Sequence, residues 1–147
     1  LPLAAVKGVT DAATRARLLR DAALWRNVHV APSDAQAEDE ISALLLSTRH
    51  HMMHVRQSLN PDDFVIDPVN LNPWTDPAVS DADALPFILA TGTIFGSPAR
   101  VREQVAELRD VGVRHLLCQT GFGDMSHERQ TASMRLLGQE VIPAFPD

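Results

Sequence analysis

Four short apolar runs, each separated from the next by a stretch with helical periodicity, constrain this chain more than any other feature of its sequence. The runs lie at residues 3–6, 27–31, 91–95 and 113–119. Short runs rich in Val, Ile and Leu that end at Gly, Pro or a polar turn are typical of β-strands. Strands that alternate with helices pair in parallel, because the helix carries the chain back to the same end of the sheet. The sequence therefore predicts an α/β fold with about four parallel strands.

Helices are expected between and after these strands. They are predicted at residues 12–25, 33–59, 81–90, 98–111 and from 127 to near 142. The second could be one helix or two that break near Ser47. Several prolines lie between residues 60 and 80, so regular structure is not expected there. Residues 33–90 therefore form a long helical and Pro-rich insertion between two strands.

Polar caps and apolar stripes support these helices. The side chains that can cap them are Thr10 or Asp11, Ser33, Ser97 and Ser126. Gln36 lies three residues after Ser33 and would complete a capping box, and Gly112 ends the fourth helix in a left-handed conformation. The expected buried stripes are Leu18, Leu19, Ala22 and Trp25 in the first helix and Met134, Leu137 and Val141 in the last.

Composition excludes several classes of partner. The chain has 147 residues, a formal net charge of −6 and one cysteine. Its Lys and Arg residues are dispersed, so neither a nucleic acid nor an anionic membrane surface is an expected partner. The apolar runs are too short to cross a bilayer. Cys118 cannot form a disulfide within the chain, which favours a cytoplasmic protein, and its place in the run 113–119 predicts a buried, unreactive thiol.

Three large enzyme classes lack their motifs here. The sequence contains no Gly-x-Ser-x-Gly nucleophile turn, no phosphate-binding loop of the nucleotide hydrolases and no Gly-rich dinucleotide fingerprint. No residue is therefore assigned a catalytic role from the sequence.

Five segments, in their order and spacing, resemble a known family. Residues 93–98 (TIFGSP), 112–117 (GVRHLL), 121–123 (GFG) and 140–143 (EVIP) follow one another, and residues 28–37 form a strand-to-helix passage upstream of them. This succession resembles the closing segment of the bacterial-luciferase-like flavin monooxygenases. The resemblance covers nearly the whole chain, although each segment by itself is common.

The resemblance implies a TIM-barrel enzyme that oxidises a small organic substrate with reduced FMN and O₂. A separate flavin reductase would supply the reduced FMN. A deazaflavin-dependent oxidoreductase is an open alternative. A (β/α)₈ barrel takes about 250 residues and eight strands, so residues 1–147 would be the C-terminal part of one barrel domain.

A section of a barrel leaves open sheet edges and an uncovered apolar face. The missing N-terminal half of the barrel or another subunit is expected to cover them, and a homo-oligomer is the expected state. The competing interpretation is a non-catalytic barrel relative that forms oligomers through these edges.

Loops that follow the strands are the expected cofactor sites, because barrel enzymes place their chemistry there. The predicted cofactor-binding residues are Lys7, Gly8, Thr10, Gly121, Phe122 and Gly123. An ordinary turn and helix cap is the competing interpretation of each loop. The amides near Gly96 and Ser97 could bind a phosphate, but Pro98 removes one of them, so helix capping is the simpler interpretation.

Met52 and Trp74 are the predicted substrate-binding residues. Met52 could line an apolar pocket or pack in the core, and Trp74 could belong to a lid or anchor its loop. His50 and His54 lie one helical turn apart, but two ligands do not make a metal site, and no metal is predicted. His29 alternates with Val28 and Val30 and is expected to be a satisfied buried histidine on the opposite face of its strand.

Overall fold

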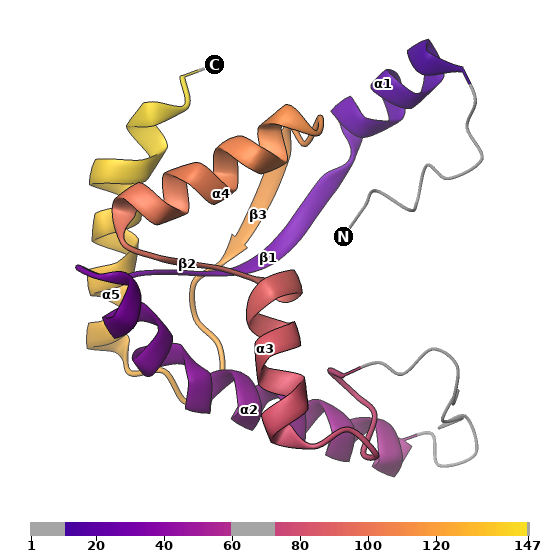
Figure 1. The fold of residues 1–147 in the computed structure, drawn as a ribbon, viewed down its shortest axis with the longest axis vertical. Coiled ribbons are helices and arrows are strands. Elements are labelled where there is room, and N and C mark those ends of the chain that lie inside the picture. The colour runs from indigo at the N-terminus through magenta and orange to yellow at the C-terminus, as the bar shows by residue number, and fades with distance from the viewer. Residues whose placement is uncertain (1–10, 60–72, 147) are drawn as a thin grey trace.

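The computed structural model describes residues 11–59 and 73–146, and strand β1 (Ala23–Val30) lies at the centre of their sheet (Figure 1). The strand order is β2-β1-β3, and both pairings are parallel. β2 (Thr93–Gly96) pairs with the second half of β1, and β3 (His115–Gln119) pairs with the first half. The predicted α/β fold with a parallel sheet is confirmed for these three strands. The run at 3–6 lies outside the described residues.

The strand order differs from that of a barrel segment at one place. Consecutive strands of a (β/α)₈ barrel lie side by side. Here β3 follows β2 along the chain but pairs with β1, with Leu24 opposite Leu116 and Trp25 opposite Leu117. β2 and β3 are therefore both edge strands among the described residues.

The helices agree with the predicted ones in number and order. They are α1 (Ala12–Asp21), α2 (Asp34–Leu59), α3 (Asp81–Gly92), α4 (Pro98–Asp110) and α5 (His127–Leu136), which continues as a π-helical turn (Leu137–Val141) and a 3₁₀ turn (Ile142–Ala144). α2 is one unbroken helix. No helix of the described segments is long and apolar enough to cross a membrane.

Most of the predicted caps are confirmed. The side chains that accept hydrogen bonds from the first amides of their helices are Asp11, Ser33, Ser97 and Ser126. The capping box at Ser33 is only half formed, because the Gln36 side chain donates to Glu40 Oε1 at 2.7 Å instead of returning to the cap. Gly112 follows α4 with a φ of 102°, as expected of a left-handed helix end.

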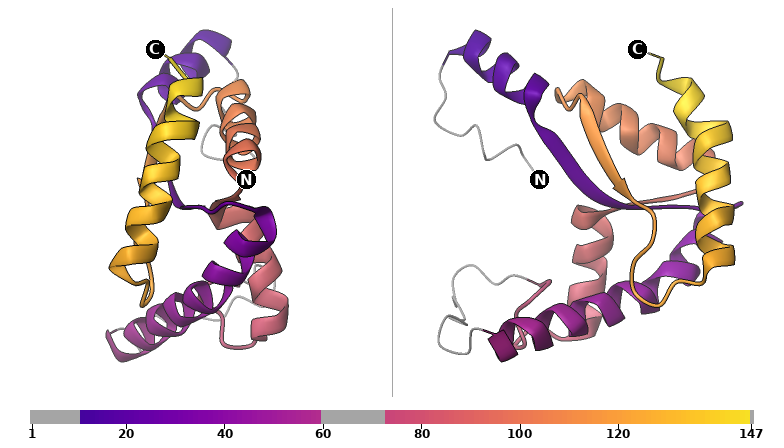
Figure 2. Two further views of the ribbon diagram at one scale, coloured as in Figure 1. Left: turned by 90° about the vertical axis from the view of Figure 1, so that its left-hand side faces the viewer. Right: turned by 180° about the vertical axis from the view of Figure 1, so that it is seen from behind.

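The two faces of the sheet are covered by different helices (Figure 2). Val28, Val30 and Ile94 pack against Val101 of α4 and Val141 after α5. The second apolar cluster joins α2 to α3 and to the loop after β3, and its buried members are Ile41, Leu45, Ala84, Ile88 and Phe122. Asn27 and His29 alternate with Val28 and Val30, so they lie on the face toward α2.

Trp25 belongs to β1 and not to the first helix, which corrects the predicted stripe. Helix α1 ends at Asp21, and pairing with β3 draws residues from Ala23 onward into the sheet. Trp25 is 51% exposed, and Leu117 beside it on the same face is 56% exposed. An exposed apolar strip therefore remains on the amino-terminal half of the sheet.

β3 is more exposed than predicted. A run buried on both faces was expected, but His115, Leu117 and Cys118 are exposed because β3 is an edge strand. Partial burial of the Cys118 sulfur still raises the pKa of its thiol, so a protonated, weakly nucleophilic group is expected at neutral pH.

Met134 is half exposed, and Ser133 is buried in its place. The Ser133 hydroxyl accepts a hydrogen bond from the amide of Val30 at 2.8 Å, which fixes this face of α5 against β1. The π-helical turn at Leu137–Val141 then lengthens the period and returns Val141 to the core. The prediction of a buried stripe at constant helical spacing is therefore wrong for Met134 and confirmed for Val141.

Arg49 of α2 is hydrogen-bonded to the segment that precedes α3. Its side chain is buried and donates to the carbonyls of Pro73, Asp76 and Val79 at 2.6–2.9 Å. It also donates to Asp81 Oδ1 at 2.6 Å. A guanidinium presents several donors in a fixed plane, so one side chain can satisfy all of these acceptors.

We expect Arg49→Met to lower the free energy of unfolding by about 3 kcal/mol, because it leaves buried carbonyls without donors and removes an ion-pair partner. Urea unfolding followed by circular dichroism measures this. Arg56→Met, at an exposed position near the end of the same helix, is the control and is expected to change stability by less than about 0.5 kcal/mol. Equal effects of the two substitutions would contradict the role given to Arg49.

Candidate functional site

The carboxyl end of the sheet is the first place to look for a site, because ligands of α/β proteins bind outside the carboxyl ends of the strands. The loops after the three strands begin at Ala31, Ser97 and Thr120. The loop after β1 leads directly into α2, and the loop after β3 passes over α2 before α5 begins. These connections bring side chains of α2 and α5 close to side chains at the carboxyl end of β1.

A buried histidine and a carboxylate form the centre of this region. His29 is 0% exposed, and its Nε2 atom lies 2.7 Å from Glu40 Oε2. Glu40 also accepts from the Gln36 side chain, and Arg129 Nε lies 3.9 Å from the same carboxylate. Three elements therefore contribute to one polar cluster: β1, α2 and α5.

Glu40 is ionised at neutral pH. Burial acts to raise the pKa of Glu40, but hydrogen bonds from Gln36 and His29, and the charges of His29 and Arg129, outweigh it and lower the pKa. A carboxylate only accepts hydrogen bonds, so the proton of the His29–Glu40 contact sits on Nε2 of His29. The other ring nitrogen, Nδ1, is then a proton acceptor whenever the imidazole is neutral.

His29 and Asn27 carry buried polar atoms that have no partner in the described part of the chain. His29 Nδ1 and both amide atoms of Asn27 are buried and make no hydrogen bond within the described residues. Asn27 is 1% exposed and precedes His29 by two residues on the same face of β1. Buried polar atoms are nearly always hydrogen-bonded, so this group is suited to hold a polar group of a ligand and to exchange a proton with it.

Protein atoms pack closely against the glycine loop after β3. Phe122 is 4% exposed and belongs to the apolar cluster of α2 and α3. A Cβ added to Gly121 would lie 2.7 Å from Gln130 Nε2, and one added to Gly123 would lie 2.8 Å from the carbonyl oxygen of Leu44. These glycines let the loop approach α2 and α5 closely. Whether Gly121, Phe122 and Gly123 also contact a cofactor stays a prediction.

The amino end of α4 holds a carboxylate. Asp34 Oδ1 accepts a hydrogen bond from the Ser97 amide at 2.7 Å, and the Ser97 hydroxyl accepts one from the Arg100 amide. Hydrogen bonds from the backbone and side chain of Ser97 lower the pKa of Asp34. A negative charge therefore occupies the place where a phosphate would bind, which favours the capping interpretation.

The two predicted substrate-binding residues lie apart from this cluster. Met52 is 41% exposed on α2, whereas Trp74 is half-buried against the apolar cluster of α2 and α3. A Cβ on Gly92 would lie 2.7 Å from the Trp74 ring, so this tryptophan anchors its segment to α3. Their proposed contact with substrate stays a prediction. Lys7, Gly8 and Thr10 lie outside the described residues.

One histidine of α2, His50, has a structural partner. His50 Nε2 lies 2.9 Å from Asp81 Oδ2, beside the Arg49–Asp81 pair. In the part of the chain that the structure describes, no group of three metal-ligating side chains comes together.

Sequence reasoning placed His29 on the correct face but missed Asn27 and Glu40. The available signal was a pair of polar residues at alternate positions, 27 and 29, in an otherwise apolar strand end. Comparison with known proteins adds no further site residue: no protein-family model matches the chain, and no curated protein matches it either.

The lowered pKa of Glu40 predicts how stability depends on pH. A carboxyl group with a depressed pKa adds stability above its unfolded value, here 4.5, and this stability is lost as the pH falls through the folded value. We therefore expect the free energy of unfolding of the unaltered chain to fall more steeply below pH 4.5 than that of Glu40→Gln. Glu38→Gln, on the exposed side of α2, is the control and should keep the steeper slope. If the free energy of unfolding of Glu40→Gln and of the unaltered chain fell equally steeply with decreasing pH, the stabilising role given to the Glu40 carboxylate would be contradicted.

Proposed function

We propose that this chain is a section of a luciferase-like flavin-dependent oxidoreductase, and that its His29–Glu40 pair transfers a proton during oxidation of a small organic substrate. The observation that carries the proposal is the buried Nδ1 atom of His29, which has no partner among residues 11–59 and 73–146 while Glu40 holds Nε2 at 2.7 Å. A carboxylate that fixes one ring nitrogen orients the other toward the reacting group and stabilises the imidazolium that forms. Asn27 would hold the same ligand through its amide.

The amino end of α4 does not fit the phosphate of FMN. Asp34 takes the free amide at the start of α4, and protein atoms fill the space beside Gly121 and Gly123. A dianionic phosphate beside Asp34 would be repelled. The proposal therefore leaves the phosphate of FMN, or of a deazaflavin, to residues outside those described. It keeps Gly121, Phe122 and Gly123 as predicted cofactor contacts and gives His29 the proton-transfer role.

A barrel is part of the same proposal. The edges of β2 and β3 would be paired when further strands join the sheet, and elements packed on its face would cover the exposed strip of Trp25 and Leu117. In a barrel whose strands follow one another in chain order, β3 would also have to pair with β2 instead of β1. A separate reductase would supply the reduced flavin, and a second copy of the chain is the alternative cover for the exposed strip.

The test uses the complete gene product that carries this sequence. We expect that protein to bind reduced FMN and to consume oxygen, and His29→Gln to lower turnover by about a hundredfold, the usual size of a general acid–base contribution. Flavin affinity and the circular dichroism spectrum should change little in this variant. His50→Gln, on the exposed part of α2, is the matched control.

Two results would contradict the proposal. A complete protein that binds neither FMN nor a deazaflavin would rule out the flavin-dependent class. Full turnover in His29→Gln would remove the proton-transfer role while leaving the class open.

A further inference from the structure

A small cavity lies at the amino end of β3, where the second half of α4 meets the residues after the 3₁₀ turn. Its volume is about 310 Å³, at the lower end of the range for ligand sites, so it suits a small molecule. Most of its lining is apolar, and the only charged side chains that line it are those of Arg109 and Arg114. The apolar lining residues are Val105, Leu108, Val113, Leu116, Phe145 and Pro146.

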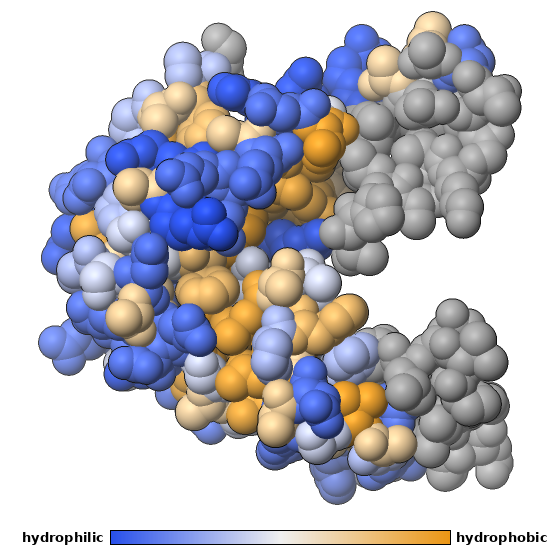
Figure 3. Space-filling view, viewed as in Figure 1, coloured by the Kyte–Doolittle hydropathy of each residue, from blue (hydrophilic) through white to orange (hydrophobic). Residues whose placement is uncertain are grey.

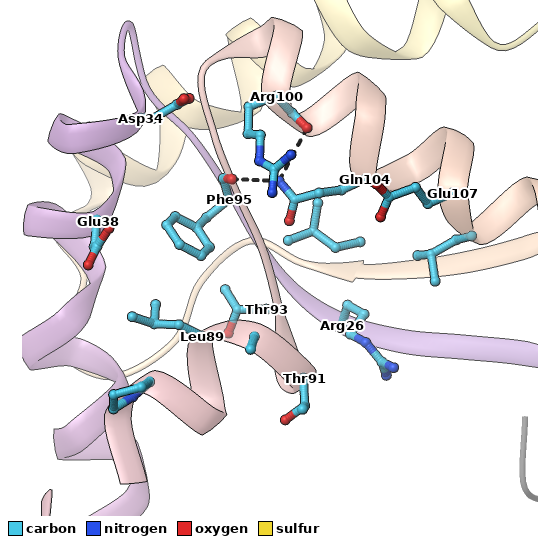
Figure 4. A pocket seen from close by; sticks show the side chains of 14 residues that line it. Arg26, Asp34, Glu38, Leu89, Thr91, Thr93, Phe95, Arg100, Gln104 and Glu107 are labelled. Carbon is cyan, nitrogen blue, oxygen red and sulfur yellow. Dashed lines mark hydrogen bonds between the residues drawn. The ribbon is translucent and has the colours of Figure 1, made fainter. Parts of the chain in front are cut away.

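A larger cavity, of about 650 Å³, lies along the outer edge of β2 between α3 and α4 (Figure 4). Its lining is mostly polar, and an arginine and a carboxylate lie at each of its ends. These are Arg100 with Asp34 and Glu38, and Arg26 with Glu107. Charges that balance within a lining do not select the charge of a ligand. The cavity at β3 differs, because its charged lining residues are both cations.

The apolar wall of the cavity at β3 belongs to the packed core. Leu108, Leu116 and Phe145 all pack against the buried cluster that includes Val28 and Val30. Hydrophilic residues cover the side of α4 that faces the viewer in Figure 3, so the apolar side chains of this helix lie on its other sides. A wall that is held by the core keeps its shape without a ligand, and the apolar part of a small molecule would meet a preformed surface.

Arg109 forms one charged side of the cavity. Its guanidinium carbon lies 5.7 Å from the centre of the Phe145 ring, a cation–π distance that holds the side chain against the cavity wall. Its Nε and Nη2 atoms each lie 3.4 Å from Oδ1 of Asp110, which is exposed and does not line the cavity. The neighbouring carboxylate therefore offsets part of the charge of Arg109.

Arg114 carries the charge that is not offset. Its Nη1 atom donates to the carbonyl of Arg109 at 3.1 Å, which anchors the guanidinium at the end of α4. No carboxylate lies within 4.0 Å of Arg114 in the ranges 11–59 and 73–146. A guanidinium has several N–H donors in a fixed plane, so donors remain for an anion. Two arginines and the carboxylate of Asp110 leave one net positive charge beside the apolar wall.

We propose that this cavity binds a small monocarboxylate with an aromatic or branched aliphatic body. The carboxylate accepts hydrogen bonds from Arg114, and the body lies among Val113, Leu116 and Phe145. One net positive charge matches one carboxylate, whereas a dianion such as phosphate would leave a charge uncompensated beside apolar side chains.

This binding is independent of the proposed flavin chemistry. The cavity lies on the face of the sheet that α4 and α5 cover, where Leu116 packs with Val28 and Val30. His29 and the exposed Leu117 lie on the opposite face, because successive residues of a strand alternate between faces. A ligand in the cavity therefore does not reach the His29–Glu40 pair through the sheet.

The probe is phenylacetate, titrated into the full chain of 147 residues and followed by NMR of the methyl groups. We expect a Kd of about 1 mM or tighter, which is ordinary for a ligand of about ten non-hydrogen atoms. The neutral amide, phenylacetamide, has the same shape and should bind about tenfold more weakly, because it lacks the charge-assisted hydrogen bond. Equal affinity for the two probes, or tighter binding of inorganic phosphate, would overturn the proposal.

A matched variant locates the carboxylate. Arg114→Gln, at an exposed position, should weaken binding of phenylacetate by about tenfold and leave binding of phenylacetamide unchanged, since both changes remove the same interaction. Arg135→Gln, an exposed arginine of α5 that does not line the cavity, is the control and should leave both affinities unchanged. Additive effects of Arg114→Gln and of the amide would overturn the assignment of Arg114.

The methyl signals locate the apolar body without any substitution. Phenylacetate should shift the signals of Val113 and Leu116, which line the cavity. The signals of Ile41 and Leu45, which belong to the apolar cluster of α2 and α3, should stay where they are. Saturable binding that leaves Val113 and Leu116 unshifted would place the ligand elsewhere and contradict the proposal.

Discussion

Strand β1 hydrogen-bonds to β3 along its first half and to β2 along its second half, and the helices on both faces are placed by this double pairing. Asn27 is the residue where the two halves meet, opposite both Thr93 and Gln119. From this point to the carboxyl end the strand is fully buried, with Val28 and Val30 toward α4 and α5 and Asn27 and His29 toward α2. Before it, Trp25 remains exposed. The strand thus divides the molecule into a covered carboxyl half and an open amino half.

Burying a polar side chain without hydrogen-bond partners destabilises a fold, so the partners of the polar residues on the central strand indicate whether they have a role beyond structure. Glu40, which Gln36 and Arg129 support, hydrogen-bonds to one nitrogen of the His29 ring, and the other nitrogen has no partner in the ranges that the structure describes. Asn27 is not compensated at all within the described residues. Two unsatisfied side chains next to each other destabilise the fold unless a ligand group satisfies them, and native structures contain few such groups. This arrangement is the physical basis for placing the candidate chemistry at His29.

Local signals in the sequence predicted most of the elements. Ser97 followed by Pro98, the polar cap at Ser126 and the long stripe of α2 depend only on neighbours within one or two turns, and each was found where it was expected. Trp25, Cys118 and Met134 were misplaced because their surroundings depend on tertiary contacts. Pairing with β3 takes Trp25 out of the helix, the edge position exposes Cys118, and the buried Ser133–Val30 hydrogen bond turns Met134 outward.

The candidate site shows the same division between local and tertiary information. The alternation of Val28, His29 and Val30 was enough to place His29 on the opposite face of β1, but its partner Glu40 comes from another element. The Arg49 contacts join α2 to a segment more than twenty residues further along the chain, and no local sequence pattern predicts them. The glycines at 121 and 123 lie close to Gln130 of α5 and Leu44 of α2, and a local pattern of glycines does not identify these partners.

The most direct test of the account is the tautomer of His29, read from the ¹⁵N chemical shifts of its ring in the labelled chain. We predict that neutral His29 carries its proton on Nε2, where Glu40 accepts it, and leaves Nδ1 unprotonated. In Glu40→Gln the ring loses the carboxylate that fixes this form, and its shifts should move toward a mixture of both tautomers. A neutral ring protonated on Nδ1, or shifts that do not respond to Glu40→Gln, would contradict the proposed role of the pair.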